Sequence, residues 1–261
     1  MTIMTNDLQL TTENYKVVYF LSDLHLGAPH DPRTRQTERR VVAFLESIRK
    51  DATAVYLLGD ILDYWYEYRY VVPKGFVRFF AKLAELVDDG IRVVWMIGNH
   101  DIWMGDYLPG ELGIEVLDGT LTETIGDHTF FLTHGDGVGR MKKTFSILRR
   151  IFRNPFCQWL YSGIHPRWTI PFAYAWSARS RKHGCPGGGE ELPLLSALRD
   201  FSREYHRLHP EIDFFIYGHL HLLVKEEIAP GCEMLILGEW IHTFSYARYD
   251  GHTVTLHTYE Q

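Results

Sequence analysis

IRVVWMIGNHD, at residues 91–101, joins an apolar strand to a polar motif at its carboxyl end. Six of the first seven residues are apolar and two are β-branched valines, which is typical of a buried strand. Gly98-Asn99-His100-Asp101 follows at once. Asn and Asp are common in turns, but a turn does not require a histidine as well. The motif therefore indicates a functional site at the end of the strand.

Two similar units precede this segment. AVYLL (54–58) ends at Gly59-Asp60, and KVVYFL (16–21) ends at Ser22-Asp23-Leu24-His25. Residues 37–50 and 74–89 have apolar side chains at helical spacing. The alternation of strand and helix predicts an α/β fold in which the polar strand ends meet at one edge.

Shorter strands are expected on the carboxyl side. IEVL (114–117), LTETI (121–125) and HTFFLT (128–133) predict a second, antiparallel sheet region, and the last of them ends at His134-Gly135-Asp136. DFFIY (213–217) ends at Gly218-His219-Leu220-His221, and residues 233–260 alternate like a closing meander. Helices are expected over residues 140–152, 159–182 and 190–208.

Composition narrows the class of protein. Of the 261 residues 46% are hydrophobic and 23% are charged, which is ordinary for a folded chain and predicts one domain over 1–261. Cys157, Cys185 and Cys232 lack a C-x-x-C spacing and predict free thiols in a reducing compartment. Since no signal core or membrane-length apolar run is found, we expect a cytoplasmic chain without a spanning helix.

Charge is unevenly distributed. The net charge of −6 argues against a nucleic-acid partner, yet residues 140–183 hold ten Lys/Arg and no Asp/Glu. The same segment carries nine aromatic residues: Phe145, Phe152, Phe156, Trp159, Tyr161, Trp168, Phe172, Tyr174 and Trp176. It predicts a basic, aromatic helical insert within the domain. The alternative is a buried helical pair whose aromatic residues are core and whose charges form a solvated rim.

The five strand-end motifs together offer carboxylate, amide and imidazole ligands. In D-x-H and H-x-H, residues two apart can turn toward the same side of an extended segment. A set without thiolates suits Mn, Fe, Zn or Co. The predicted metal ligands are Asp23, His25, Asp60, Asn99, His134, His219 and His221. The other histidines lack such a context and are expected to be structural or at the surface: His30, His128, His165, His183, His206, His209, His242, His252 and His257.

This order of motifs resembles the calcineurin-like metallophosphoesterase superfamily over nearly the whole chain. The resemblance implies two mixed β-sheets packed as a sandwich, flanked by helices, with a helical insert over the active site. It also implies two divalent metal ions, with Mn²⁺ first and Fe, Zn or Co as alternatives, and a water activated between them to attack phosphorus. One ion would be held by Asp23, His25, Asp60 and His221, and the other by Asp60, Asn99, His134 and His219.

The resemblance also implies catalytic roles for two neighbours of Asn99. His100 would be the general acid, and Asp101 would hold its ring tautomer. The alternative is that His100 only hydrogen-bonds the substrate phosphate, as Asn99 also could. Asp63 and Asp136 are expected to support the ligands or cap helices.

Four stretches narrow the resemblance: GDILDYW (59–65), HGDG (134–137), RRIFRNP (149–155) and WSARSR (176–181). They are similar to the UDP-2,3-diacylglucosamine diphosphatases of lipid A biosynthesis, in the Bacteroidetes-type branch. That family forms UMP and 2,3-diacylglucosamine 1-phosphate by water attack at the α-phosphorus, at the inner face of the cytoplasmic membrane. The chain departs from the better-known members, which have Arg at the position of His100; a phosphomonoester leaving group could make the acid dispensable.

In this reading the insert covers the metal site, receives the acyl chains and rests its basic face on anionic lipid. Some of its arginines could turn inward to substrate phosphates instead: Arg149, Arg153, Arg179 and Arg181. Two other functions stay open. One is a soluble metallophosphodiesterase or phosphatase acting on another nucleotide or phosphodiester, and the other is a non-catalytic scaffold of the same fold.

Overall fold

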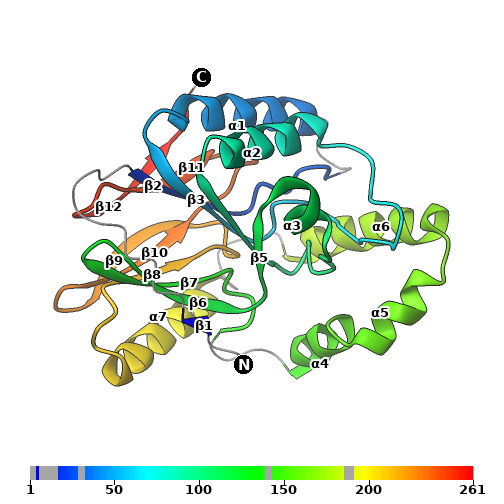
Figure 1. The fold of residues 1–261 in the computed structure, drawn as a ribbon. Coiled ribbons are helices and arrows are strands. Elements are labelled where there is room, and N and C mark those ends of the chain that lie inside the picture. Colours follow the sequence, from blue (N-terminus) through cyan, green and yellow to red (C-terminus); the bar gives the residue numbers. More distant parts are fainter. Residues whose placement is uncertain (1–3, 6–16, 29–32, 139–142, 185–190, 261) are drawn as a thin grey trace.

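Two six-stranded mixed sheets face each other in the computed structural model, which describes residues 4–5, 17–28, 33–138, 143–184 and 191–260 (Figure 1). The first sheet has the order β12 (Val254–Thr258), β11 (Ser245–Tyr249), β2 (Val17–Leu21), β3 (Ala52–Leu58), β4 (Arg92–Met96) and β5 (Glu115–Leu117). The second has the order β1 (Met4–Thr5), β6 (Thr120–Ile125), β7 (His128–Thr133), β8 (Phe214–Tyr217), β10 (Cys232–Leu237) and β9 (Leu223–Ala229). The expected sandwich of two mixed sheets is confirmed.

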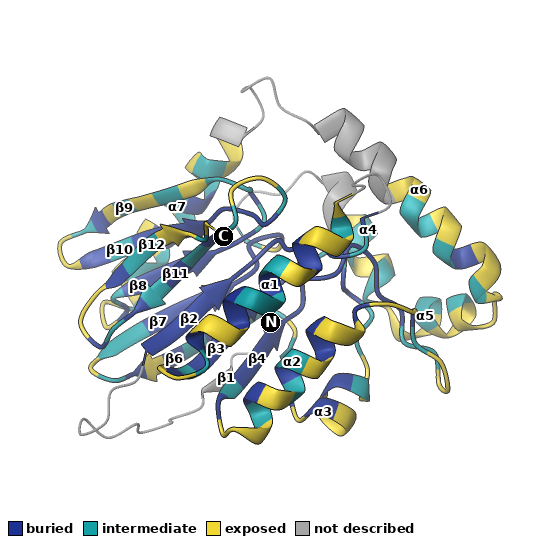
Figure 2. Cartoon of the chain, turned by 90° about the horizontal axis from the view of Figure 1, so that it is seen from above, coloured by how far each residue is buried: buried dark blue, intermediate teal, exposed yellow. Residues whose placement is uncertain are grey.

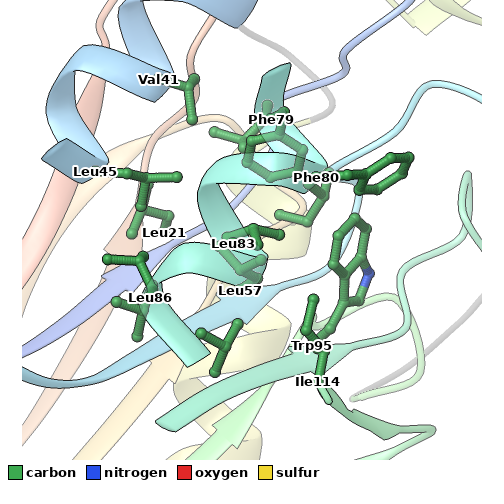
Figure 3. Close-up of a cluster of buried hydrophobic side chains, with 14 of the residues drawn as sticks. Leu21, Val41, Leu45, Leu57, Phe79, Phe80, Leu83, Leu86, Trp95 and Ile114 are labelled. Atoms are coloured by element: carbon green, nitrogen blue, oxygen red, sulfur yellow. The ribbon is translucent and has the colours of Figure 1, made fainter. Parts of the chain in front are cut away.

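The parallel strands β2, β3 and β4 are connected through helices that cover the outer face of the first sheet. These helices are α1 (Thr34–Ile48) and α2 (Val77–Asp88), close to the predicted ranges. Figure 3 shows Val41 and Leu45 of α1 and Phe79 of α2 meeting Leu57 and Trp95 of the sheet. All five are completely buried, and each contributes about 1.5–3 kcal/mol by leaving water.

Apolar side chains also fill the space between the sheets. In β2, Val18 and Phe20 point to this inner layer, where Phe20 stacks on Phe130 of β7 with 5.7 Å between ring centroids. Tyr19 and Leu21 point to the helices instead. Burial on both faces explains why this strand reads as a continuous apolar run. Figure 2 shows the buried strands between partly exposed helices.

The outer face of the second sheet is covered by α7 (Glu191–Leu208), where the sequence predicted a helix. Leu198 of this helix packs in one buried cluster with Phe131 and Phe215 of the sheet. Its Ser202 hydroxyl lies 2.8 Å from the hydroxyl of Tyr217. The sandwich therefore has helices on both outer faces, as expected.

For two parts of the chain, the sequence predicted strands correctly but assigned them the wrong neighbouring strands. Strand β5 pairs in parallel with β4 in the first sheet, because the short helix α3 (Tyr107–Leu112) returns the chain to the same end. The carboxyl-terminal strands form no single meander, since β10 lies between β8 and β9 while β11 and β12 form a hairpin in the other sheet. Periodicity identifies a strand but not the strand that it pairs with.

Three helices project to one side of the sandwich: α4 (Lys143–Phe152), α5 (Pro155–Ser162) and α6 (Pro166–Gly184) (Figure 1). The helix predicted over residues 159–182 is two helices. Asn154 caps the first, accepting hydrogen bonds from the backbone of Phe156 and Cys157, and Gly163 ends it. Pro166 then begins the second.

Tyrosine and tryptophan side chains attach these helices to the sandwich. The indole of Trp103 donates to the carbonyl of Phe152 at 2.8 Å, and the hydroxyl of Tyr66 donates to the carbonyl of Gln158 at 2.7 Å. None of the helices in the described ranges has the length and apolar character that a membrane crossing requires.

Candidate metal centre

The five motifs meet at one rim of the sandwich. Asp23 and His25 follow β2, Asp60 follows β3, and Asn99 follows β4, all in the first sheet. His134, His219 and His221 follow β7 and β8 in the second sheet. Contact across the sheets is close, since Nε2 of His25 lies 3.1 Å from Nε2 of His221. The structure thus brings together side chains that are up to 198 positions apart in the sequence.

Backbone strain is concentrated in the same motifs. Asp23, His25, Asp60, His219 and His221 have φ angles between 43° and 68°. Among the described non-glycine residues, the only others with positive φ are two phenylalanines. This left-handed region costs free energy and persists where the surrounding structure enforces it, often at functional sites. The strain indicates that the motifs are shaped to aim their side chains inward.

Two glycines permit the close packing of the rim. A Cβ atom on Gly98 would lie 2.2 Å from Oδ1 of Asp60, and one on Gly218 would lie 1.9 Å from Oγ of Ser22. Any larger residue would displace the loops that hold Asp60 and Asp23. These two positions therefore require glycine for space.

The first group of possible ligands is Asp23, His25 and His221. Oδ2 of Asp23 accepts hydrogen bonds from the Ser22 hydroxyl at 2.6 Å and from the backbone of His219 at 2.9 Å. Its Oδ1 is buried and has no hydrogen-bond partner in the described part of the chain. This oxygen faces Nε2 of His221 at 3.1 Å and Nε2 of His25 at 3.7 Å. Convergence of a carboxylate oxygen and two imidazole nitrogens fits a divalent cation.

The second group is Asp60, His134 and His219, with Asn99 beside it. Nε2 of His134 lies 3.3 Å from Oδ2 of Asp60 and 3.3 Å from Oδ1 of Asn99. Nδ1 of His134 is 2.8 Å from the carbonyl of Leu58. If Nδ1 donates this hydrogen bond, the lone pair of Nε2 points into the site, as in a metal-binding histidine.

Asp60 lies between the two groups. Its Oδ2, which faces His134, is also 3.9 Å from Nε2 of His25 in the first group. Its Oδ1 accepts a hydrogen bond from the backbone of His100 at 2.8 Å. A carboxylate in this position can serve both groups, which is the arrangement of a dinuclear site.

The electrostatics of the rim favour cations. Burial raises the pKa of Asp60, but His134 and His100 outweigh it and hold that pKa well below its usual range. Burial lowers the pKa of His134, but the charge of Asp60 outweighs it and raises that pKa to about 10. His219 differs, because burial and the neighbouring His134 lower its pKa to about 4. Buried carboxylates that draw protons onto imidazoles create a negative potential that bound cations would neutralise.

The residues around His100 differ from the expectation in one respect. Nδ1 of His100 lies 3.0 Å from the carbonyl oxygen of Asp63 and 3.7 Å from its Oδ1. The same carboxylate lies 3.4 Å from Nδ1 of His25. Among the described residues, Asp63 is therefore positioned to orient the His100 ring; it lies three residues after Asp60, and the sequence marked it only as a supporting group.

Asp101 ties two loops together instead of facing His100. Its completely buried carboxylate accepts hydrogen bonds from the backbone of Gly98 (2.8 Å), Ile61 (2.9 Å) and Asp60 (3.3 Å), and from the indole of Trp95 (3.2 Å). Burial and the charge of Asp60 raise its pKa to about 6. Asp101 was expected to hold a ring tautomer, and its contacts show that it holds the backbone around Asp60.

Two of the four arginine candidates have acidic partners. Nε of Arg149 lies 2.9 Å from the buried Asp136, next to His134, and Arg153 binds both carboxylate oxygens of Asp118 at 2.9–3.1 Å. The side chains of Arg179 and Arg181 lie outside the described residues. Ser22, which orients Asp23, was missed by the sequence reasoning because serine before a loop is common.

Comparison with known proteins places these observations in context. Residues 16–223 match the family described as Calcineurin-like phosphoesterase. A protein of Porphyromonas gingivalis named UDP-2,3-diacylglucosamine hydrolase is 42% identical over 260 residues, covering 93% of this chain and 97% of its own length. An Actinobacillus succinogenes protein of the same name is 26% identical, covering 87% of this chain and 93% of its own length. A solved dimetal phosphatase from Danio rerio is 15% identical with a TM-score of 0.40, covering 95% of this chain and all of its own.

Proposed function

This chain belongs to the calcineurin-like phosphoesterase family, and from that premise we propose that it hydrolyses the pyrophosphate of UDP-2,3-diacylglucosamine. The products would be UMP and 2,3-diacylglucosamine 1-phosphate, formed by water attack at the α-phosphorus. The observation that carries the substrate is the 42% identity, over nearly the whole length of both proteins, to a relative with that name.

Two divalent ions would be held by the two ligand groups of the rim. Asp23, His25 and His221 would hold one, and His134, His219 and Asn99 the other, with Asp60 shared between them. The set contains only nitrogen and oxygen donors, which suits Mn, Fe, Zn or Co alike. Mn²⁺ is the proposed metal because the family resemblance puts it first. When bound, such ions lower the pKa of a coordinated water and neutralise charge on phosphoryl oxygens.

The protein's own residues would orient the substrate and move a proton. The ring of His100 is only partly buried and is 4.0 Å from Oδ2 of Asp60, so it can reach a phosphate placed at the rim. Asp63 would keep Nε2 of that ring directed toward the leaving group by holding Nδ1. His100 would then act as general acid, or as a phosphate donor where the leaving group needs no proton.

Helices α4 to α6 would form a cap, within a single domain, that receives the acyl chains. Exposed large hydrophobic side chains gather there: Ile147, Ile151, Phe156, Trp159, Leu160, Ile164, Trp168, Phe172 and Trp176. The five aromatic residues among them are 52–69% exposed, which supports a contact surface over the buried core that was the alternative. Tyr174 of α6 lies near the rim, with its ring 5.8 Å from that of Tyr64, which follows Asp63.

The same cap would place the enzyme on the cytoplasmic face of the membrane. Residues 140–183 carry ten basic and no acidic residues, and a basic helical surface with exposed tryptophans suits a peripheral contact with anionic lipid. A lipid-linked substrate reaches the active site most directly from that surface.

Release of UMP tests the proposal. Protein loaded with Mn²⁺ should release UMP from UDP-2,3-diacylglucosamine in detergent, and chelation should stop the reaction. Hydrolysis of small phosphodiesters alone would favour a soluble phosphodiesterase. Loss of all hydrolysis in a folded, metal-loaded protein would favour a scaffold of the same fold.

A further inference from the structure

A second exposed apolar segment lies outside the cap. The connection between β3 and α2 leads into a tip, defined here as residues 69–78, which includes the start of α2. Phe76 within the tip is buried in the core, but three other large side chains are exposed. Tyr70 is 83% exposed, Val71 54% and Val77 74%. These fractions are as high as those of the aromatic residues in the cap. A group of large apolar side chains exposed to water favours association and marks a candidate contact surface.

The tip is also cationic. Residues 69–82 contain four basic residues and no acidic one. Arg69, Lys74 and Arg78 are exposed and form no ion pair with any described residue. Lys82, one turn further along α2, behaves differently, because it pairs with Glu46 and Glu85. The unpaired charges are therefore confined to the part of the segment that carries the exposed apolar groups.

The base of the tip contacts the cap. The hydroxyl of Tyr68, at the base of the tip, lies 2.6 Å from the hydroxyl of Thr169 in α6. Tyr66, two residues earlier, binds the carbonyl of Gln158 in α5. Figure 1 shows the connection, in cyan, passing beside α6. The two exposed apolar regions thus belong to adjoining elements, not to opposite faces of the molecule.

We infer that the tip is a second membrane-contact element, which binds the surface of an anionic phospholipid bilayer together with the cap. The inference rests on the proposed lipid substrate and extends its membrane contact to a part of the sandwich itself. A tyrosine ring suits the interface between headgroups and acyl chains, and the valines add apolar area. The guanidinium of Arg69 lies over the Tyr70 ring at 5.1 Å, and this charge, with those of Lys74 and Arg78, suits anionic headgroups. Two linked weak contacts bind more tightly than either alone, because the first raises the effective concentration of the second.

Two sets of substitutions in the full chain test the inference. One replaces the apolar groups, Tyr70→Ser with Val71→Ser, and the other the charges, Arg69→Gln, Lys74→Gln and Arg78→Gln. The matched control changes an exposed leucine and arginine on α7, Leu208→Ser with Arg203→Gln, on the far side from the cap (Figure 1). Binding is measured by sedimentation with phosphatidylcholine vesicles, with and without phosphatidylglycerol.

Loss of the charges should weaken binding to anionic vesicles about fivefold per charge at low salt, the equivalent of about 1 kcal/mol each. The difference should shrink at high salt, since the charges are exposed. The apolar variant should weaken binding at both salt concentrations. UMP release in detergent should match that of the unchanged protein in both variants, and the control should bind vesicles normally.

Unchanged vesicle binding in both tip variants would overturn the inference while leaving the proposed function standing. Concentration-dependent self-association that the tip variants abolish, without any vesicle binding, would also overturn it and assign the tip to a second copy of the chain. Failure of the unchanged protein to release UMP in detergent would instead count against the proposed function, because that measurement involves no bilayer.

Discussion

The rim of the sandwich and the cap of α4 to α6 differ in whether their side chains have partners within the protein. At the rim, buried polar groups are held by backbone donors, and strained residues such as Asp23 and Asp60 are fixed by the strands behind them. In the cap, large apolar groups such as Trp159 and Trp168 remain in solvent, and a few hydroxyl and indole bonds attach the helices. The difference teaches that the rim is built to hold its geometry, whereas the cap leaves large apolar side chains exposed to solvent.

The largest expected effect concerns the residue shared by both ligand groups. Asp60→Ala should lower turnover at least about a thousandfold with every substrate, because both ions would lose a ligand. Metal content measured on the purified variant should fall with it. Circular dichroism provides the control for folding, and near-normal rates in a folded variant would contradict the shared site.

Replacement of His100 should separate acid catalysis from phosphate binding. His100→Asn should slow aryl phosphodiesters with poor leaving groups about a hundredfold or more, and the pyrophosphate substrate much less. His100→Arg is the matched variant, since arginine donates hydrogen bonds to phosphate but gives up no proton. Recovery of the aryl esters by arginine would show that position 100 only binds phosphate.

Asp101→Asn tests whether the rim depends on the backbone behind Asp60. The amide would keep one oxygen acceptor and turn its NH2 toward one of two donor pairs, either the backbone N–H groups of Gly98 and Asp60 or those of Ile61 and the Trp95 indole. We expect metal affinity to fall about 10–100-fold, as measured by calorimetry. Excess Mn²⁺ should restore activity; a variant that stays inactive at saturating metal would mean that Asp101 acts in some other way.

Arg153→Ala asks whether the base of the cap contributes to substrate binding. Loss of a charge-assisted contact to phosphate should raise KM for the lipid substrate in detergent about tenfold, with little change in kcat. Asp118→Ala is the control, because it removes the partner that Arg153 binds and leaves the guanidinium in place. Equal effects of the two substitutions would assign Arg153 to the ion pair alone.

The smallest expected effect concerns the attachment of the cap. Tyr66→Phe removes the hydrogen bond to Gln158 and should cost about 1 kcal/mol locally. Amide hydrogen exchange should then become about fivefold faster in α5 and stay unchanged in β3. Tyr70→Phe, whose side chain is 83% exposed, should change neither. Faster exchange in both elements would mean that the cap and the sandwich unfold as one unit.

Local sequence determined much of this protein. The apolar runs that end at Asp23, Asp60 and Asn99 identify buried strands because such strands are covered on both faces. Glycine before Asp60 and Asn99, and serine before Asp23, marks where they stop. Helices α1, α2 and α7 follow from apolar periodicity in the same way. The acid-free segment 140–183 set the cap apart by charge alone.

Only the tertiary structure decided which residues meet. The partner of β5, the division of the last three strands between the sheets, and the contact of Asp63 with both His25 and His100 depend on how the sheets pack. Asp101 lies next to His100 in the sequence, yet its carboxylate accepts hydrogen bonds from the backbone N–H groups of Gly98 and Ile61 in the loops after β4 and β3. The physical reason is that adjacent residues can point in opposite directions, and only packing determines which buried donor a carboxylate must satisfy.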